Sequence, residues 1–194
     1  MVKRTFEEKQ NITEEDIHLR LKALAPLLQQ EYLENLLKRF NLQLNLKVLA
    51  SKKLAELYAQ RGMLSSAAKI MTNAAMAVET FAAKEEMHMS AGMLSVKAGD
   101  YLLADDNFKW ALNSAAPSDK ARVQKQAADF YLKEAAELEK TGKIAKAAHL
   151  YDRLLRSENT KEESTKRMIK EKLMVLYEKL GKIQESLRMR DSLK

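Results

Sequence analysis

The residue types that most often carry catalysis are dispersed along this sequence. The three histidines, His18, His88 and His149, are far apart, and none belongs to a metal-binding pattern such as HExxH. The acidic residues Glu85 and Glu86 are adjacent, so on a helix their carboxylates would point to different sides. No serine stands in a nucleophile motif, and there is no glycine-rich phosphate loop. We therefore expect a non-enzymatic protein with no metal and no cofactor.

Composition bounds the fold that must position any site. The chain has 194 residues, of which 46% are hydrophobic and 31% charged, with five glycines, two prolines and no cysteine. It is too apolar for a disordered chain and too poor in turn residues for a sheet protein, so one elongated all-α domain is expected. The absence of cysteine excludes a disulfide scaffold. Because the sequence shows no signal peptide and no long apolar run, we expect a cytoplasmic protein without a membrane span.

The formal net charge of +7 is concentrated near the carboxyl end. Residues 121–194 hold 18 basic and 12 acidic residues, whereas the rest of the chain is close to neutral. The two signs are interleaved there, as in Glu163, Lys166, Arg167 and Glu171, which is typical of a solvated helix face. No basic block or basic-aromatic stripe is present. We therefore rank a protein-binding function first and keep binding of RNA or an anionic surface through this last third as the alternative.

Four of the five glycines recur with the period of a helical repeat. Gly62, Gly99, Gly142 and Gly181 are separated by 37, 43 and 39 residues. Apolar pairs at helical spacing precede each glycine, and an apolar anchor and a small residue follow it after two and five positions. This pattern predicts a helix, a tight turn with glycine in the left-handed region, and a second helix. Stacked units would bury the apolar face that one unit leaves exposed, which predicts a solenoid.

The second unit carries a more specific pattern, formed by Gly92, Gly99-Asp100-Tyr101, Ala104, Phe108, Ala111, Leu112 and Pro117. These residues resemble the tetratricopeptide repeat, and the long period is similar to that of the soluble NSF attachment protein group. The resemblance covers residues 48–194 and implies a right-handed α-α superhelix of four units, at about 48–84, 85–125, 126–165 and 166–194. His88 occupies the place of an early aromatic residue of the family, so a packed, hydrogen-bonded core histidine is expected there.

Residues 1–47 lie outside the repeat register. Thr13, followed by three acidic residues, predicts the start of a helix, and Pro26 predicts the first turn of another. Residues 40–48 alternate as a strand would, but no partner strand is evident, so a helix that runs on into the first unit is expected. Residues 14–40 would then form a helical hairpin that either caps the solenoid or joins two chains as a homodimer, with residues 1–11 as a tail.

The family resemblance also implies which residues face a partner. In tetratricopeptide arrays the first helix of each unit lines a concave groove, and the matching positions include Lys52, Lys53, Glu56, Met89, Ser90, Met93, Lys97, Leu132, Lys133, Lys172 and Val175. Met89 and Met93, one helical turn apart, are expected to form an exposed apolar pair. By contrast, Met71, Met76 and Met87 follow inward stripes and are expected to fill the core.

Some members of the family capture a chaperone's carboxyl terminus with a clamp of lysines, asparagines and arginine. Here Lys52 and Lys133 match two of the five clamp positions, but Glu56, Ser90 and Asp129 occupy the others. The two acidic side chains would repel an anionic terminus, which excludes that ligand. The expected function is that of a scaffold or adaptor that binds a peptide or an amphipathic helix of a partner protein.

Overall fold

The computed structural model describes residues 12–157, 160 and 162–193, and this part of the chain contains no strand. Its ten helices are α1 (Glu14–Ala23), α2 (Pro26–Leu37), α3 (Leu44–Gln60), α4 (Leu64–Ala77), α5 (Phe81–Ala98), α6 (Tyr101–Ser114), α7 (Lys120–Lys140), α8 (Ile144–Arg156), α9 (Glu163–Lys179) and α10 (Ile183–Asp191). The predicted all-α solenoid is therefore confirmed. The expected tail, residues 1–11, lies outside the described residues.

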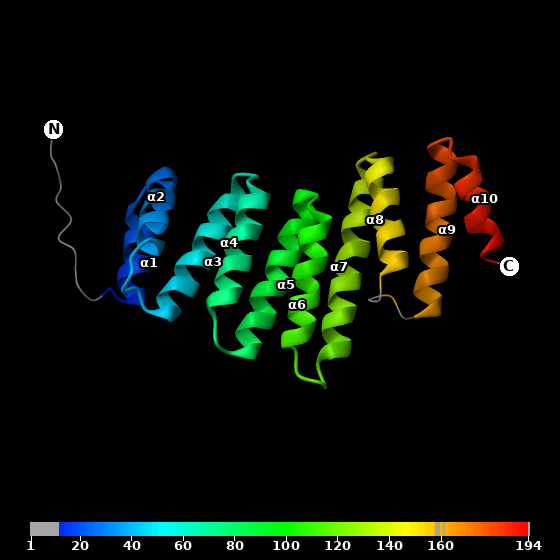
Figure 1. Ribbon diagram of the computed structural model, residues 1–194. Coiled ribbons are helices and arrows are strands. Elements are labelled where there is room, and N and C mark those ends of the chain that lie inside the picture. The colour runs from blue at the N-terminus through cyan, green and yellow to red at the C-terminus, as the bar shows by residue number, and fades with distance from the viewer. Residues whose placement is uncertain (1–11, 158–159, 161, 194) are drawn as a thin grey trace.

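The helices are arranged as antiparallel pairs in the order of the chain (Figure 1). The pairs α3/α4, α5/α6, α7/α8 and α9/α10 follow one another along an elongated row, and α1/α2 lies at its amino-terminal end. Each helix from α3 onward contacts its predecessor, and α5 also contacts α7. Because contacts join neighbouring pairs and not distant ones, the molecule has the quasi-one-dimensional architecture of a repeat array.

The turn glycines adopt the backbone that the repeat pattern predicted. Gly62, Gly99, Gly142 and Gly181 have φ between +70° and +82°, a region in which a β-carbon is strained. At the first turn, Met63 N–H donates to the carbonyl of Tyr58 at 2.8 Å, which closes the helix end in the way typical of a left-handed C-terminal cap.

The amino-terminal hairpin forms largely as expected. The Thr13 hydroxyl accepts a hydrogen bond from Asp16 N–H at 3.2 Å, and the Asp16 carboxylate accepts one from Thr13 N–H at 3.1 Å. Pro26 occupies the first turn of α2. The helix expected from residue 40 onward begins only at Leu44, so the strand-like alternation ahead of it belongs to a short connection.

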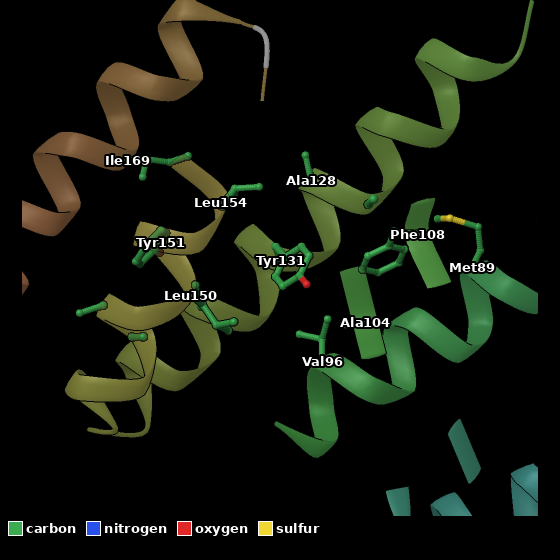
Figure 2. Packing of buried hydrophobic residues seen from close by; sticks show 14 of the residues in the cluster. Met89, Val96, Ala104, Phe108, Ala128, Tyr131, Leu150, Tyr151, Leu154 and Ile169 are labelled. Carbon is green, nitrogen blue, oxygen red and sulfur yellow. The ribbon is translucent and has the colours of Figure 1, made fainter. Parts of the chain in front are cut away.

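The core runs along the array as three successive apolar clusters. The first joins the hairpin to α3, the second joins α3, α4 and α5, and the third extends from α5 to α9. In the third cluster the rings of Phe108 and Tyr131 are neighbours (Figure 2), and their centroids are 5.6 Å apart in an edge-on arrangement. No unit buries its apolar surface alone, because each cluster takes side chains from at least two helix pairs.

Candidate functional site

The predicted groove residues all lie on the first helices of the four units. Lys52, Lys53 and Glu56 are on α3, Met89, Ser90, Met93 and Lys97 on α5, Leu132 and Lys133 on α7, and Lys172 and Val175 on α9. We call the side of the array formed by α3, α5, α7 and α9 the odd-helix face. Whether these helices adjoin decides whether the face is one surface or four separate ones.

Ion pairs join successive helices of the odd-helix face. Their N–O distances are 2.7 Å for Lys52–Glu86 between α3 and α5, 2.6 Å for Glu85–Arg122 between α5 and α7, and 3.1 Å for Glu139–Lys172 between α7 and α9. The Lys97 ammonium also lies 6.0 Å from the centre of the Phe130 ring, again between α5 and α7. Partly exposed pairs of this kind contribute at most about 1 kcal/mol each. Their geometry nevertheless makes the odd-helix face continuous over all four units.

The expected exposed methionine pair is wrong for Met89. Only 6% of Met89 is exposed, because its side chain packs into the third core cluster, and Figure 2 shows it beside Phe108. Met93 is half-buried and packs against the same cluster. The reason is the position of α5, which contacts α4, α6 and α7, so that Met87, His88 and Met89 are all buried although they are consecutive in sequence. A helix enclosed on three sides has little surface left for a partner.

The predictions for the other methionines are confirmed in two cases and wrong in one. Met71 and Met87 are buried in the second cluster, as predicted. Met76 is 60% exposed on α4, so the expectation that it fills the core is wrong. Of the other apolar groove positions, Leu132 is half-buried against the third cluster and Val175 is 41% exposed. The apolar surface offered by the odd-helix face is thus smaller than the sequence suggested, and it lies mainly on α7 and α9.

Two pockets open beside the predicted residues, at different ends of the array. One, of about 390 Å³, lies between the hairpin and α3, where Lys53 and Glu56 face His18 and Gln29. The Lys53 ammonium and the Glu56 carboxylate are 3.1 Å apart. The hairpin's share in this pocket could not be predicted, because nothing in a sequence outside the repeat register shows which side of α3 the hairpin covers.

The second pocket, of about 270 Å³, lies between α7 and the connection that leads to α9. Asp129 and Leu132 of α7 line it together with Thr160 and Thr165. It brings one predicted apolar position, Leu132, next to hydroxyl and carboxylate groups. Lys133, the neighbouring residue, is exposed. The predicted groove residues therefore do not converge on one site, and they form a long surface with a hollow towards each end.

His88 has the structural role that the sequence indicated. It is 6% exposed, and its Nδ1 lies 2.9 Å from Asn107 Oδ1, which also accepts a hydrogen bond from the Thr72 hydroxyl at 3.2 Å. The ring of Trp110 lies 5.3 Å from the His88 ring. Burial lowers the pKa of His88 below its ordinary value, and the hydrogen bond to Asn107 opposes this shift in part. His88 is therefore a core residue in its neutral form.

A second polar cluster ties α6, α7 and α8 together. The Tyr131 hydroxyl donates to Asp105 Oδ1 at 2.6 Å, and Arg153 Nε donates to Asp105 Oδ2 at 2.8 Å. Burial raises the pKa of Tyr131 strongly, and its hydrogen bond to the Asp105 carboxylate adds to the shift. A tyrosine that stays neutral donates a hydrogen bond that stabilises the fold, and it does not act as a base.

Two further features are absent from the described residues. Residues 12–157, 160 and 162–193 contain no group of three or more histidine, aspartate and glutamate side chains placed to hold a metal ion. Within the same ranges, none of the helices has the length and apolar character that crossing a membrane requires.

Comparison with known proteins leaves the family open. No protein-family model matches the chain, and no curated protein matches it. Among solved structures the chain is similar to the crystal structure of BtubC (BKLC) from P. vanneervenii, with 15% sequence identity and a TM-score of 0.40. The match covers 92% of this chain and 75% of the other. A similarity at this level says nothing about function, so the inference of function rests on the surface of the molecule itself.

Proposed function

We propose that this protein is a non-enzymatic scaffold whose odd-helix face binds a peptide or an amphipathic helix of a partner protein. The observation that supports the proposal is the continuity of that face. Ion pairs bridge α3 and α5, α5 and α7, and α7 and α9, so polar side chains of successive odd helices meet along the face. An extended surface built from similar units suits an extended ligand, which can contact several helices in turn.

The resemblance of the second unit to the tetratricopeptide repeat agrees with this proposal. It implies that the odd-helix face is concave and that it holds the ligand. Lys133, exposed on α7, and Val175, exposed on α9, are the positions at which we expect direct contact, and Leu132 would form the floor between them. Lys52 and Lys172 already have carboxylate partners within the chain. We therefore expect them to bridge neighbouring helices of the face and to contribute little to the affinity for a partner protein.

Site-specific photo-crosslinking tests the proposal. A photoreactive amino acid would replace Lys133 or Val175 on the odd-helix face, and Lys109 or Lys146, both exposed on the even helices α6 and α8, as matched controls. The full-length chain would be expressed in the cells from which it derives, and cross-linked partners would be identified by mass spectrometry. We expect one or a few proteins to crosslink at the two odd-helix positions and not at the controls. Equal crosslinking at all four positions, or none, would refute the proposal.

Binding of RNA or an anionic surface through residues 121–194 stays the alternative. Four of the cations that suggested it are engaged within the chain: Lys166 with Glu163 at 3.5 Å, Arg167 with Glu171 at 3.3 Å, Lys172 with Glu139, and Lys170 with the carbonyl of Ser192. Lys161, which also suggested it, lies outside the described residues. These contacts weaken the positive field that phosphates would meet. A steep loss of RNA binding as salt rises would favour the alternative, because phosphate contacts release counterions.

A further inference from the structure

An apolar groove opens between α3 and α4, away from the residues predicted to bind a partner. It measures about 260 Å³, and each helix contributes one face at positions i, i+3, i+4 and i+7: Leu44, Lys47, Val48 and Ser51 from α3, and Ile70, Asn73, Ala74 and Ala77 from α4, with Leu37 at the end of α2. This volume lies below the range of about 300–1,000 Å³ that holds most small-molecule ligands. Its size and lining suit one or two large apolar side chains.

The groove exists because two residues of the first unit are short. Ser51 stands 11 residues before the turn glycine Gly62, and Asn73 stands 11 residues after it. In the second unit the same two positions around Gly99 hold His88 and Trp110. There the two rings lie 5.3 Å apart and fill the space between the helices.

In the later units the same two positions are linked by polar contacts. In the third unit these positions are Tyr131 and Arg153, which bind the same Asp105 carboxylate. In the fourth unit they are Lys170 and Ser192, whose ammonium and carbonyl groups are 3.1 Å apart. In the first unit the two short side chains, Ser51 and Asn73, leave the space between the helices open. The most direct filler, on the evidence of the second unit, is an aromatic side chain.

The charge around the groove indicates what accompanies that side chain. Lys47 is the charged residue among those that line it, and no acidic residue lines it. Two large apolar side chains near the groove in sequence are exposed, Phe40 by 96% in the α2–α3 connection and Met76 by 60% one turn from Asn73. An apolar groove whose one charged lining residue is a lysine complements an acidic amphipathic segment.

We propose that the α3–α4 groove is a docking site for an acidic amphipathic helix of a partner protein, which inserts an aromatic side chain between Ser51 and Asn73. The helix lies along the two antiparallel helices and places its carboxylates near Lys47. A second copy of this chain docking through the same groove would set Lys47 against Lys47, which is repulsive. This site does not depend on the odd-helix face.

A synthetic probe tests the proposal on the full-length chain. The probe is a labelled peptide of about eighteen residues, long enough to be helical, with tryptophan and leucine on one face and glutamate on the other. A second peptide carries lysine in place of every glutamate. Binding would be followed by fluorescence anisotropy, and amide shifts in NMR spectra would locate it. We expect the acidic peptide to bind, with shifts concentrated in residues 44–51 and 70–77, and the basic peptide not to bind.

Two variants with matched controls decide the mechanism. Asn73→Trp reproduces the plug of the second unit and should weaken binding about thirtyfold, because a buried aromatic anchor loses its pocket, whereas Asn113→Trp on the exposed side of α6 should have no effect. Lys47→Glu should weaken binding of the acidic peptide, and Lys109→Glu should not. Circular dichroism would verify that each variant is folded, and Lys47→Glu carries the test if Asn73→Trp does not fold.

Several results would each overturn the proposal. The first is absence of binding by the acidic peptide at millimolar concentration. The second is unchanged binding by both groove variants, or equal binding of the two peptides. The third is a dimer in sedimentation velocity that Asn73→Trp converts to a monomer, which would make a second copy of the chain the occupant.

Discussion

Substitution of Gly92 by alanine tests the packing between α5 and α6. A β-carbon built on Gly92 would lie 2.6 Å from Cε1 and 2.8 Å from Cδ1 of Phe108. These distances are far inside van der Waals contact, so either the ring or the helix must move. Phe108 is 3% exposed and has the Tyr131 ring at its edge, which leaves the ring little room to retreat.

The size of the effect follows from two opposing contributions. Overpacking of a well-filled core typically costs about 1–3 kcal/mol. Alanine is a better helix former than glycine, which returns about 1 kcal/mol at an exposed helix position. The clash involves three ring atoms, so the cost should lie towards the upper part of its range. We expect a net loss of about 1–2 kcal/mol, or a melting temperature lower by roughly 2–8 °C for a chain of this length.

Thermal and urea unfolding followed by circular dichroism would measure this loss. The matched control is the double variant Gly92→Ala with Phe108→Leu, compared with each single variant. Because the smaller side chain vacates the space that the new methyl group needs, the two free-energy losses should not add, and the double variant should be more stable than their sum predicts by about 1 kcal/mol. A Gly92→Ala variant as stable as the parent, or strict additivity, would show that the close contact is not the reason for glycine at this position.

Three further perturbations follow from the structure. Gly142→Ala should destabilise the chain by about 1–2 kcal/mol in urea melts although its β-carbon meets no atom, because φ is +75° there; an unchanged midpoint would contradict the role given to the turn. Burial holds the pKa of His88 below 6.5, so as the pH falls His88 is protonated in the unfolded chain before it is protonated in the folded one. The contribution of His88 to the free energy of unfolding should therefore be complete above about pH 6.5 and decrease as the pH falls below it. The variant His88→Gln should reduce that pH dependence. Leu27 and Leu28 are exposed by 72% and 49% on the hairpin, and if the hairpin joins two chains, Leu27→Glu with Leu28→Glu should halve the mass in light scattering; a parent chain that is already a monomer would end the dimer hypothesis.

The architecture could be predicted from the sequence because it depends on local rules. Left-handed turns favour glycine, and a helix start favours Thr13 with acids behind it, whatever lies elsewhere in the chain. The close contact at Gly92 could also be predicted, since a small residue seven positions before a turn glycine is part of the repeat pattern. Each of these inferences needed only a few neighbouring residues.

The surface was harder to predict because it depends on which helices enclose which. Met89 follows a stripe that would be exposed if α5 had two neighbours, and it is buried because α7 is a third. The prediction for Met76 is wrong in the opposite sense: it was expected to be buried, and it is exposed because no helix covers its side of α4. The α3–α4 groove was overlooked because its signal is a comparison between units: Ser51 and Asn73 are unremarkable residues until they are set beside His88 and Trp110.

The hydrogen bonds among Thr72, Asn107 and His88 also fix the order in which the units can stand. They join α4 of the first unit to α5 and α6 of the second, and no side-chain nitrogen or oxygen buried in the described part of the chain lacks a partner. If the third unit were placed where the first one is, Asn107 Oδ1 would lose the hydroxyl of Thr72 and keep only His88 as a partner, which costs about 0.5–1.5 kcal/mol for one hydrogen bond. The units are therefore not fully interchangeable, because a chain with duplicated or shuffled units would lose this hydrogen bond at the joint.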